Sequence, residues 1–302
     1  MKKLSLVGFV SVRDRRRDVT KKAIAEALSL IKYTFPRNIK KVVIKPNLCY
    51  YQDFSTGQTT DPEFVAAFID LIRERLPDVD MAVVESDASA MKCRHVFRML
   101  GYDRLCEEMG VDLVNLSEDV CSMVETNVDG NKIRLMVPKT IQEADLRVNI
   151  PKIKYMTSGC KITCAMKNIF GCNPYPLKFK YHPALAEVIV AVNKAMPFNL
   201  CLVDGFMASG VEPRKLGLVM AGVDCVAVDA EASRIAGVNP KTIQYLRLAK
   251  KEGMGEMNAE RIGVPLSLFA ARYPRRSPFM RLRGKVYGLI MQVGLGKKLG
   301  FE

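Results

Sequence analysis

Short apolar runs rich in β-branched residues alternate along the chain with longer segments in which apolar residues recur at helical spacing. The short runs predict strands, at Leu4–Val10, Lys41–Lys45, Met81–Glu85, Leu113–Leu116, Ile133–Val137, Leu146–Ile150, Leu200–Val203 and Leu216–Ala221. The longer segments predict helices, at Val19–Phe35, Pro62–Leu76, Met91–Met109, Pro183–Met196, Asp224–Ala236 and Pro240–Glu252. Such alternation is typical of βαβ units. It predicts an α/β fold with a mostly parallel, doubly wound sheet and helices on both faces.

Polar residues directly follow four of the predicted strands. They are Lys45-Pro46-Asn47, Glu85-Ser86-Asp87, Pro151-Lys152-Ile153-Lys154 and Asp204-Gly205. Any one of these could be an ordinary polar loop. Ligands of doubly wound sheets bind beyond the carboxyl ends of the strands. We therefore expect the four loops to line one shared cleft.

The chain has 302 residues and is 49% hydrophobic, which is enough to bury a substantial core. We expect an α/β domain over residues 1–260, followed by a basic amphipathic extension over residues 261–302. The apolar start of the chain is short and broken by Ser and Gly, so it predicts a first strand and not a signal sequence. No segment reaches the roughly 18 apolar residues that span a membrane.

The net charge of +14 is concentrated in two stretches. Residues 146–186 contain seven Lys or Arg and no acid, and residues 272–302 contain eight basic side chains and one acid. Solvated surfaces usually mix both signs, so the first stretch predicts a pocket for an anion, a metal cluster, or both. The second stretch could bind an anionic membrane surface or nucleic acid. Docking onto the main domain, or onto another subunit of a homo-oligomer, is the favoured alternative.

Lysines are the main candidates for binding a small anion. Lys is a compact cation suited to phosphate or carboxylate, and its pKa falls when it is crowded with other cations, as in a general-base or Schiff-base lysine. The alternative is a set of ordinary surface lysines. The candidates are Lys45, Lys152, Lys154 and Lys167. Asn47, Thr163 and Asn168 lie beside them, and Lys167-Asn168 falls in a predicted helix over Ile162–Phe170 whose start could face the anion.

Two groups could move a proton in such a site, namely Asp204 and His182. His182 is the one residue of the acid-free stretch that ordinarily titrates near neutral pH, although it could simply precede a helix. Asp224 is expected to cap a helix. Asp229 falls inside that helix, where a buried carboxylate would need a lysine partner or a metal. Glu85 and Asp87 could bind a divalent metal or form a polar turn.

Nine Cys in a chain without a recognisable signal sequence indicate a reducing, cytoplasmic setting. Cys160, Cys164 and Cys172 lie within the acid-free stretch, and 160 and 164 would share one face of a helix. Their spacing matches neither a zinc ribbon nor the three-cysteine motif of radical enzymes. They could hold an iron–sulfur cluster, with His182 or an external ligand, and exchange electrons with a redox partner. Free thiols are the default alternative.

A series of short motifs runs in order through residues 40–255. They are Lys45-Pro46-Asn47, Glu85-Ser86-Asp87, Ala144-Asp145, Pro151-Lys152-Ile153-Lys154, Thr163 with Lys167, Asn168, Phe170 and Gly171, Lys178 or Lys180 with His182, Val203-Asp204-Gly205, and Ala221-Gly222 with Asp224, Val226-Ala227 and Asp229. In this order they resemble the family known as domain of unknown function 362. The resemblance implies a fold and a site but no settled reaction.

The chain departs from the family pattern in two respects. Family members usually have a Glu-Gly-x-Gly-Pro turn after Val-Asp-Gly, where this chain has Ser209-Gly210-Val211-Glu212-Pro213. The missing glycines change how closely backbone can approach a ligand there. Family members are also often fused to ferredoxin-type domains, whose C-x₂-C-x₂-C-x₃-C run is absent here.

Several enzyme classes are disfavoured because no dinucleotide-binding glycine motif follows a strand and no P-loop or H-E-x-x-H motif occurs. The leading hypothesis is an enzyme that acts on a small anionic or phosphorylated ligand in a lysine-rich cleft. An iron–sulfur electron-transfer or accessory protein is the second hypothesis, and a nucleic-acid or membrane-surface binder is the third.

Overall fold

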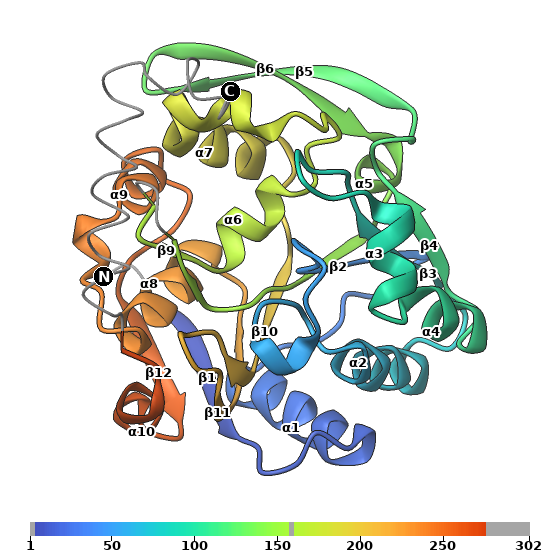
Figure 1. The fold of residues 1–302 in the computed structure, drawn as a ribbon, viewed down its shortest axis with the longest axis vertical. Coiled ribbons are helices and arrows are strands. Elements are labelled where there is room, and N and C mark those ends of the chain that lie inside the picture. Colours follow the sequence, from blue (N-terminus) through green and yellow to red (C-terminus); the bar gives the residue numbers. More distant parts are fainter. Residues whose placement is uncertain (1–3, 157–159, 276–302) are drawn as a thin grey trace.

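The computed structural model describes residues 4–156 and 160–275. Eight strands form one sheet in the order β12-β1-β11-β10-β7-β2-β3-β4 (Figure 1). They are β1 Ser5–Ser11, β2 Lys41–Pro46, β3 Asp80–Glu85, β4 Asp112–Asn115, β7 Leu146–Ile150, β10 Leu200–Ala208, β11 Arg214–Gly222 and β12 Ala259–Gly263. The two pairings of β11 are antiparallel, and the other pairings in this sheet are parallel. The predicted mostly parallel sheet is confirmed.

Helices cover both faces of this sheet (Figure 1). One face packs against α1 Arg17–Leu30, α2 Pro62–Arg75, α3 Cys93–Met99 and α4 Tyr102–Glu108. The other packs against α6 Ala165–Phe170, α7 Leu185–Ala195, α8 Cys225–Ile235, α9 Gln244–Lys251 and α10 Leu266–Arg272. Successive side chains of a strand point to opposite faces, so Val42 and Ile44 enter the first core and Val43 enters the second. The doubly wound architecture is therefore confirmed.

Smaller elements complete the fold. A hairpin of β5 Cys121–Val128 and β6 Asn131–Pro138 lies beside α7, and the short helix α5 Lys139–Gln142 follows it (Figure 1). A second antiparallel pair is formed by β8 Lys154–Tyr155 and β9 Ile162–Thr163. Three 3₁₀ turns lie at Phe54–Thr56, Lys178–Ala184 and Pro240–Thr242.

Three predicted helices differ from the structure. The helix predicted over Pro240–Glu252 is a 3₁₀ turn at Pro240–Thr242 followed by α9. The helix predicted over Met91–Met109 is divided into α3 and α4, because Gly101 adopts a left-handed conformation with φ of 74°. The helix predicted from Ile162 begins only at Ala165, since Ile162 belongs to β9 and pairs with Tyr155 of β8. The Lys167 helix is consequently short.

The end of the described chain packs on the α/β body. The expected boundary at residue 260 falls inside β12, which pairs with β1, and α10 buries Phe269 against Phe9. Residues 276–302, which carry most of the predicted basic extension, lie outside the described residues. None of the helices in the described part is long and apolar enough to cross a membrane.

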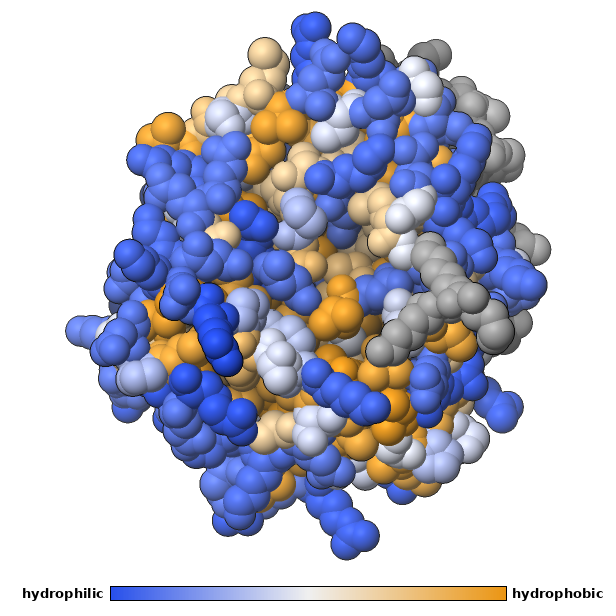
Figure 2. Space-filling model, turned by 180° about the vertical axis from the view of Figure 1, so that it is seen from behind, coloured by the Kyte–Doolittle hydropathy of each residue, from blue (hydrophilic) through white to orange (hydrophobic). Residues whose placement is uncertain are grey.

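Hydrophilic side chains cover most of the face of the molecule seen in Figure 2. Hydrophobic ones gather there in patches in the middle and lower part. This distribution agrees with a chain whose large apolar residues form the two cores on either side of the sheet.

Candidate functional site

The four strands that were expected to share a site are neighbours in the sheet, in the order β10-β7-β2-β3. From β2 the chain winds outward through β3 to β4. It then returns to place β7 on the other side of β2, followed by β10. The winding direction reverses between β2 and β7. Doubly wound folds bind ligands beyond the strand ends at such a switch point.

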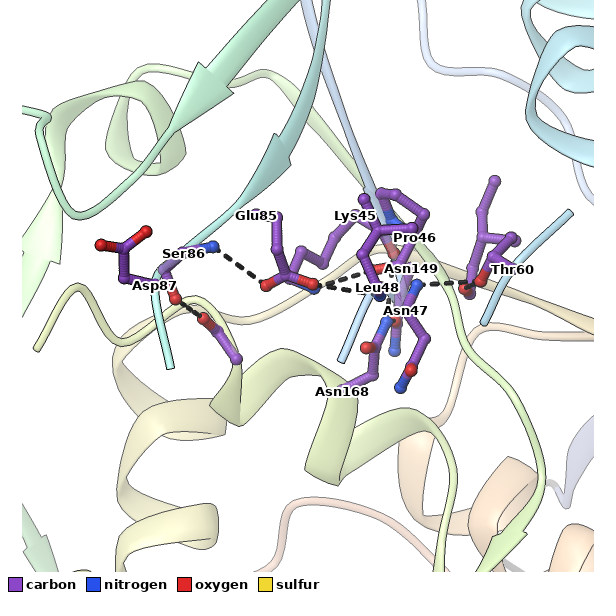
Figure 3. A network of polar contacts seen from close by, with 12 residues as sticks. Lys45, Pro46, Asn47, Leu48, Thr60, Glu85, Ser86, Asp87, Asn149 and Asn168 are labelled. Atoms are coloured by element: carbon purple, nitrogen blue, oxygen red, sulfur yellow. Dashed lines mark hydrogen bonds and ion pairs between the residues drawn. The ribbon is translucent and has the colours of Figure 1, made fainter. Parts of the chain in front are cut away.

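Side chains from both faces tie the ends of β2 and β7 together. Lys45 and Asn149 lie opposite each other in the two strands. From α6, the Asn168 amide nitrogen donates to the Lys45 carbonyl (3.1 Å) and to Oδ1 of Asn149 (2.7 Å). From the other face, the Thr60 hydroxyl donates to the Ile150 carbonyl (2.8 Å) and accepts from the backbone nitrogen of Asn47 (2.8 Å). Figure 3 shows these groups converging on the end of β2.

The first buried ion pair of the site joins the ends of β2 and β3. Nζ of Lys45 lies 2.7 Å from Oε2 of Glu85, and both side chains are buried. The Glu85 carboxylate also accepts from the backbone nitrogens of Leu48 (3.2 Å) and Ser86 (3.0 Å), as Figure 3 shows. Because both carboxylate oxygens are used, this pair holds the two strand ends in place.

A second buried ion pair joins the loop after β7 to β10. Nζ of Lys152 lies 3.0 Å from Oδ2 of Asp204, and both side chains are almost completely buried. Asp204 also accepts from the backbone nitrogens of Asp61 (2.9 Å) and Phe206 (3.1 Å). The structure therefore places Asp204, a predicted proton carrier, where it fixes Lys152 and the chain around it.

Two further buried lysines have only neutral oxygens as hydrogen-bond partners in the described part of the chain. Nζ of Lys154 donates to Oδ1 of Asn47 (2.9 Å) and to the Gln58 carbonyl (3.0 Å). Nζ of Lys178 donates to the carbonyls of Asp87 (2.8 Å) and Gly171 (3.2 Å) and contacts the Ser86 hydroxyl. Burial lowers the pKa of each ammonium group to about 8.

Lys167 is the most accessible lysine of this group. It projects from α6 and is only partly buried, with its ammonium 4.1 Å from the centre of the Phe170 ring. Within residues 4–156 and 160–275, that cation–π contact is its only polar contact. Burial lowers the pKa of Lys167, and the charge of Lys45 lowers it further. Together, Lys45, Lys152, Lys154, Lys167 and Lys178 are called the lysine cluster below.

His182 lies next to the lysine cluster, in the 3₁₀ turn Lys178–Ala184, and is partly buried. Its ring packs edge-on against Phe179, with the centroids 5.0 Å apart. Burial lowers the pKa of His182 to about 4, and the charge of Lys167 contributes to this shift. The imidazole is therefore neutral at pH 7, and the low pKa makes it a weaker base than the ordinary histidine that the sequence predicted as a proton carrier.

Asp229 occupies the start of α6, where an external anion was expected. Its carboxyl group accepts from the backbone nitrogens of Ala165 and Met166 (3.2 Å) and from the Tyr245 hydroxyl (3.1 Å). Burial raises the pKa of Asp229 to about 7. The nearby Thr163 hydroxyl is buried without a hydrogen-bond partner among the described residues. This helix start is thus capped by the protein's own carboxyl group.

The predicted cysteine cluster finds no support in the geometry. Cys160, Cys164 and Cys172 are all buried, and burial raises the pKa of Cys160 to about 11, that of Cys172 to about 12 and that of Cys164 well above its usual value. Metals bind the thiolate form. In the chain as described, no three His, Cys, Asp or Glu side chains are grouped so as to hold a metal ion. Among residues 4–156 and 160–275, the side chains therefore do not fit an iron–sulfur cluster or a divalent metal.

Two carboxylates considered for a divalent metal are also engaged elsewhere. Glu85 pairs with Lys45, and Asp87 pairs with Lys92 at 2.8 Å. Sequence analysis did not single out Asn149, which joins the ends of β2 and β7. The available signal was an amide between the apolar residues Val148 and Ile150 of a predicted strand, a position at which an unpaired polar group would be costly.

A family model described as a domain of unknown function, DUF362, matches residues 42–234. The chain belongs to the DUF362 family. The matched region contains every lysine of the lysine cluster. The chain is also similar to the thylakoid-associated protein sll1697 of Synechocystis sp., with 30% identity over 241 residues that cover 75% of this chain and 72% of the relative.

Among solved structures, this DUF362 protein is similar to the lactate racemase apoprotein of Thermoanaerobacterium thermosaccharolyticum. The TM-score is 0.44 and the sequence identity 12%, over 79% of this chain. The matched part spans 58% of the racemase chain. This likeness is too weak to transfer any property to the DUF362 protein.

Proposed function

We propose that this DUF362 protein is an enzyme that binds a small anionic compound, a carboxylate or a phosphate ester, at the lysine cluster. The observation that carries the proposal is the surplus of buried positive charge at the switch point. Five lysines converge there, whereas only Glu85 and Asp204 form ion pairs with them in the described structure. Three lysines therefore face the site without a carboxylate.

Such an arrangement is unfavourable without a ligand. Moving a cation out of water is costly unless a counter-charge accompanies it, and the lowered pKa values of Lys154, Lys167 and Lys178 express that cost. A bound anion would supply the missing charge and would strengthen each hydrogen bond that it accepts. The uncompensated positive charge lies at the sheet edge where ligands of this fold class bind.

Lys167 is the group proposed to act on the bound compound. It is accessible, and burial leaves its amine less basic than an ordinary lysine, as a general base or a nucleophile requires. His182 beside it is neutral and so adds no positive charge to the site. Lys154 would hold the anion, because it keeps one ammonium proton after its bonds to Asn47 and Gln58.

Titration calorimetry with inorganic phosphate and with a simple dicarboxylate tests the proposal. Lys167→Met is expected to weaken the binding about tenfold, the effect of one charge-assisted hydrogen bond. Lys180→Met is the matched control, since Lys180 also lies over an aromatic ring, Tyr175, but is exposed. Equal affinities of the wild type, Lys167→Met and Lys154→Met would contradict the proposal.

A second candidate is attachment to an anionic membrane surface through residues 272–302. The eight basic side chains of this stretch support it, as does the thylakoid association that the name of the Synechocystis relative prints. A truncation after Arg275 keeps Tyr273, whose hydroxyl donates to the Ile153 carbonyl at 2.8 Å. It should lose salt-sensitive sedimentation with phosphatidylserine vesicles. Equal sedimentation of both proteins would rule this candidate out.

A further inference from the structure

Two free thiols meet behind the candidate site. Sγ of Cys201 lies 3.3 Å from Sγ of Cys225. Cys201 is fully buried in β10, and Cys225 is the first residue of α8 and is partly buried. A disulfide bond is about 2 Å long, so the two sulfurs need to approach by only about 1 Å to form one.

The backbone fixes this encounter. Cys201 lies opposite Gly222 in the pairing of β10 with β11. The chain then turns into α8, where the Asp224 carboxylate accepts from the backbone nitrogens of Val226 (2.9 Å) and Ala227 (3.1 Å). This cap holds Cys225 at the helix start and directly beside Cys201. The thiol pair is therefore a feature of the packed core.

We propose that Cys201 and Cys225 form a peroxide-sensitive dithiol that closes to a reversible disulfide. Cys225 is the sulfur that a peroxide can reach. Its thiolate attacks the O–O bond of hydrogen peroxide, gives a sulfenic acid and releases hydroxide, which takes up a proton to become water. The Cys201 thiol then attacks the Cys225 sulfur, the S–O bond breaks, and the thiol proton passes to the departing hydroxide, which leaves as water. Overall, two thiols are oxidised to one disulfide and one peroxide is reduced to two water molecules.

The surroundings of Cys201 agree with its role as the second sulfur. Its hydrogen bond with Cys225 and its burial hold the pKa of Cys201 well above its usual range, so the resting group is the thiol. It cannot compete for the peroxide as a thiolate, and it is protected from solvent. The only sulfur that it contacts within bonding reach among the described residues is that of Cys225.

The dithiol also touches the residues that position the lysine cluster. The Asn149 amide nitrogen donates to Sγ of Cys201 at 3.7 Å, and Oδ1 of Asn149 accepts from Asn168. Asn168 in turn holds the Lys45 carbonyl. Drawing the Cys201 sulfur toward Cys225 weakens the first of these contacts. Through these contacts, oxidation of the dithiol disturbs the positions of the lysines and lowers the affinity for the anion. This effect rests on the proposed function.

Peptide mapping tests the disulfide itself. The reduced, full-length protein is treated with hydrogen peroxide and then alkylated before its peptides are mapped. The expected product is a Cys201–Cys225 cross-linked peptide pair about 2 Da lighter than the two thiol peptides, which dithiothreitol separates. Cys225→Ser should abolish it. Cys121→Ser should keep it, because Cys121 is also partly buried but bonds to the Asp119 carbonyl instead. The proposal would be overturned if, after peroxide treatment of the wild type, both cysteines were still alkylated as free thiols, or if Cys225 were only overoxidised.

Phosphate titration of the reduced and the cross-linked protein tests the link to the site. The cross-linked form should bind phosphate about threefold more weakly, the effect of losing part of one hydrogen bond. Equal affinities would overturn the link. Failure of the reduced protein to bind phosphate would instead count against the proposed function, and the cross-linking result would still decide the disulfide.

Discussion

Lys152 and Asp204 form an ion pair of 3.0 Å in which the two side chains are 1% and 0% exposed. The pair connects the loop after β7 to the middle of β10. The backbone nitrogens of Asp61 and Phe206 also donate hydrogen bonds to this carboxylate. A buried pair of this kind adds little net stability compared with apolar residues, but removing one partner leaves the other charge uncompensated.

Asp204→Asn should therefore lower the free energy of unfolding by about 3–5 kcal/mol, because it leaves the Lys152 ammonium buried without a counter-charge. Urea denaturation measures this change. Glu108→Gln is the control, since it removes one partner of the exposed pair Arg104–Glu108 and should change little. Comparable effects of the two substitutions would show that the Lys152 charge is compensated by another group.

Anion binding should weaken as the pH rises above neutrality. The pKa values of Lys154 and Lys178 are lowered to about 8, so both ammonium groups lose their protons between about pH 7 and about pH 9. An ordinary lysine would remain charged throughout this interval. Phosphate titrations at several pH values between these limits check the expectation. A constant affinity up to about pH 9 would show that these two lysines do not contact the ligand.

The same shift predicts how Lys154 affects stability. Its pKa is about 8 in the folded protein and 10.5 in the unfolded reference, so between these values the unfolded chain binds more protons. The contribution of Lys154 to stability therefore rises with pH across this interval. Buried thiols, whose pKa values are raised, instead lower stability as the pH rises. They are present in both the wild type and Lys154→Met, so their contribution cancels when the two proteins are compared. The variant should be more stable than the wild type near pH 7, with an advantage that shrinks toward pH 10.5. A constant difference in melting temperature would contradict this account.

Sequence patterns located the site but not its internal pairing. Lys45 and Glu85 lie at the ends of β2 and β3 as the sequence predicted, because the carboxyl ends of parallel strands lie together, whereas Asp204 lies inside β10, which continues to Ala208. Which lysine meets which carboxylate depends on the order of the strands, which short motifs do not encode. The cysteine spacing could not reveal that burial raises the pKa of all three thiols. Asn149 was overlooked because it lies inside a predicted strand and not in the loop after it.

His182 should not titrate near pH 6.5. The chain has two histidines, and burial together with the Lys167 charge lowers the pKa of His182 to about 4. In proton NMR spectra, its ring signal should stay constant between about pH 5.5 and about pH 8. His182→Asn assigns that signal. Lys167→Met should raise the pKa of His182, because it removes a neighbouring positive charge. A midpoint near 6.5 in the wild type would show that His182 is not buried in the way the structure places it.

Gly57 directly precedes Gln58, whose carbonyl accepts a hydrogen bond from Lys154. A substitution at Gly57 should therefore affect both the stability of the fold and the candidate site. Gly57 has a φ of 70°, and a β-carbon there would lie 2.5 Å from the Ser209 nitrogen and 2.6 Å from the Ala208 carbonyl carbon. Gly101 has a similar φ of 74°, but a β-carbon there would meet nothing within 4 Å. Gly101→Ala should thus cost only the backbone strain, about 1 kcal/mol.

Gly57→Ala carries the same strain and must also move the Phe54–Thr56 turn away from the end of β10. It should lower the free energy of unfolding by about 1–3 kcal/mol more than Gly101→Ala does, as overpacking usually costs. It should also weaken phosphate binding, because Gln58 moves with it and Lys154 loses one of its two acceptors. Urea denaturation and phosphate titration of both variants separate these effects. If the two alanine variants lost the same stability and bound phosphate equally, the contact between Gly57 and β10 would not support the site.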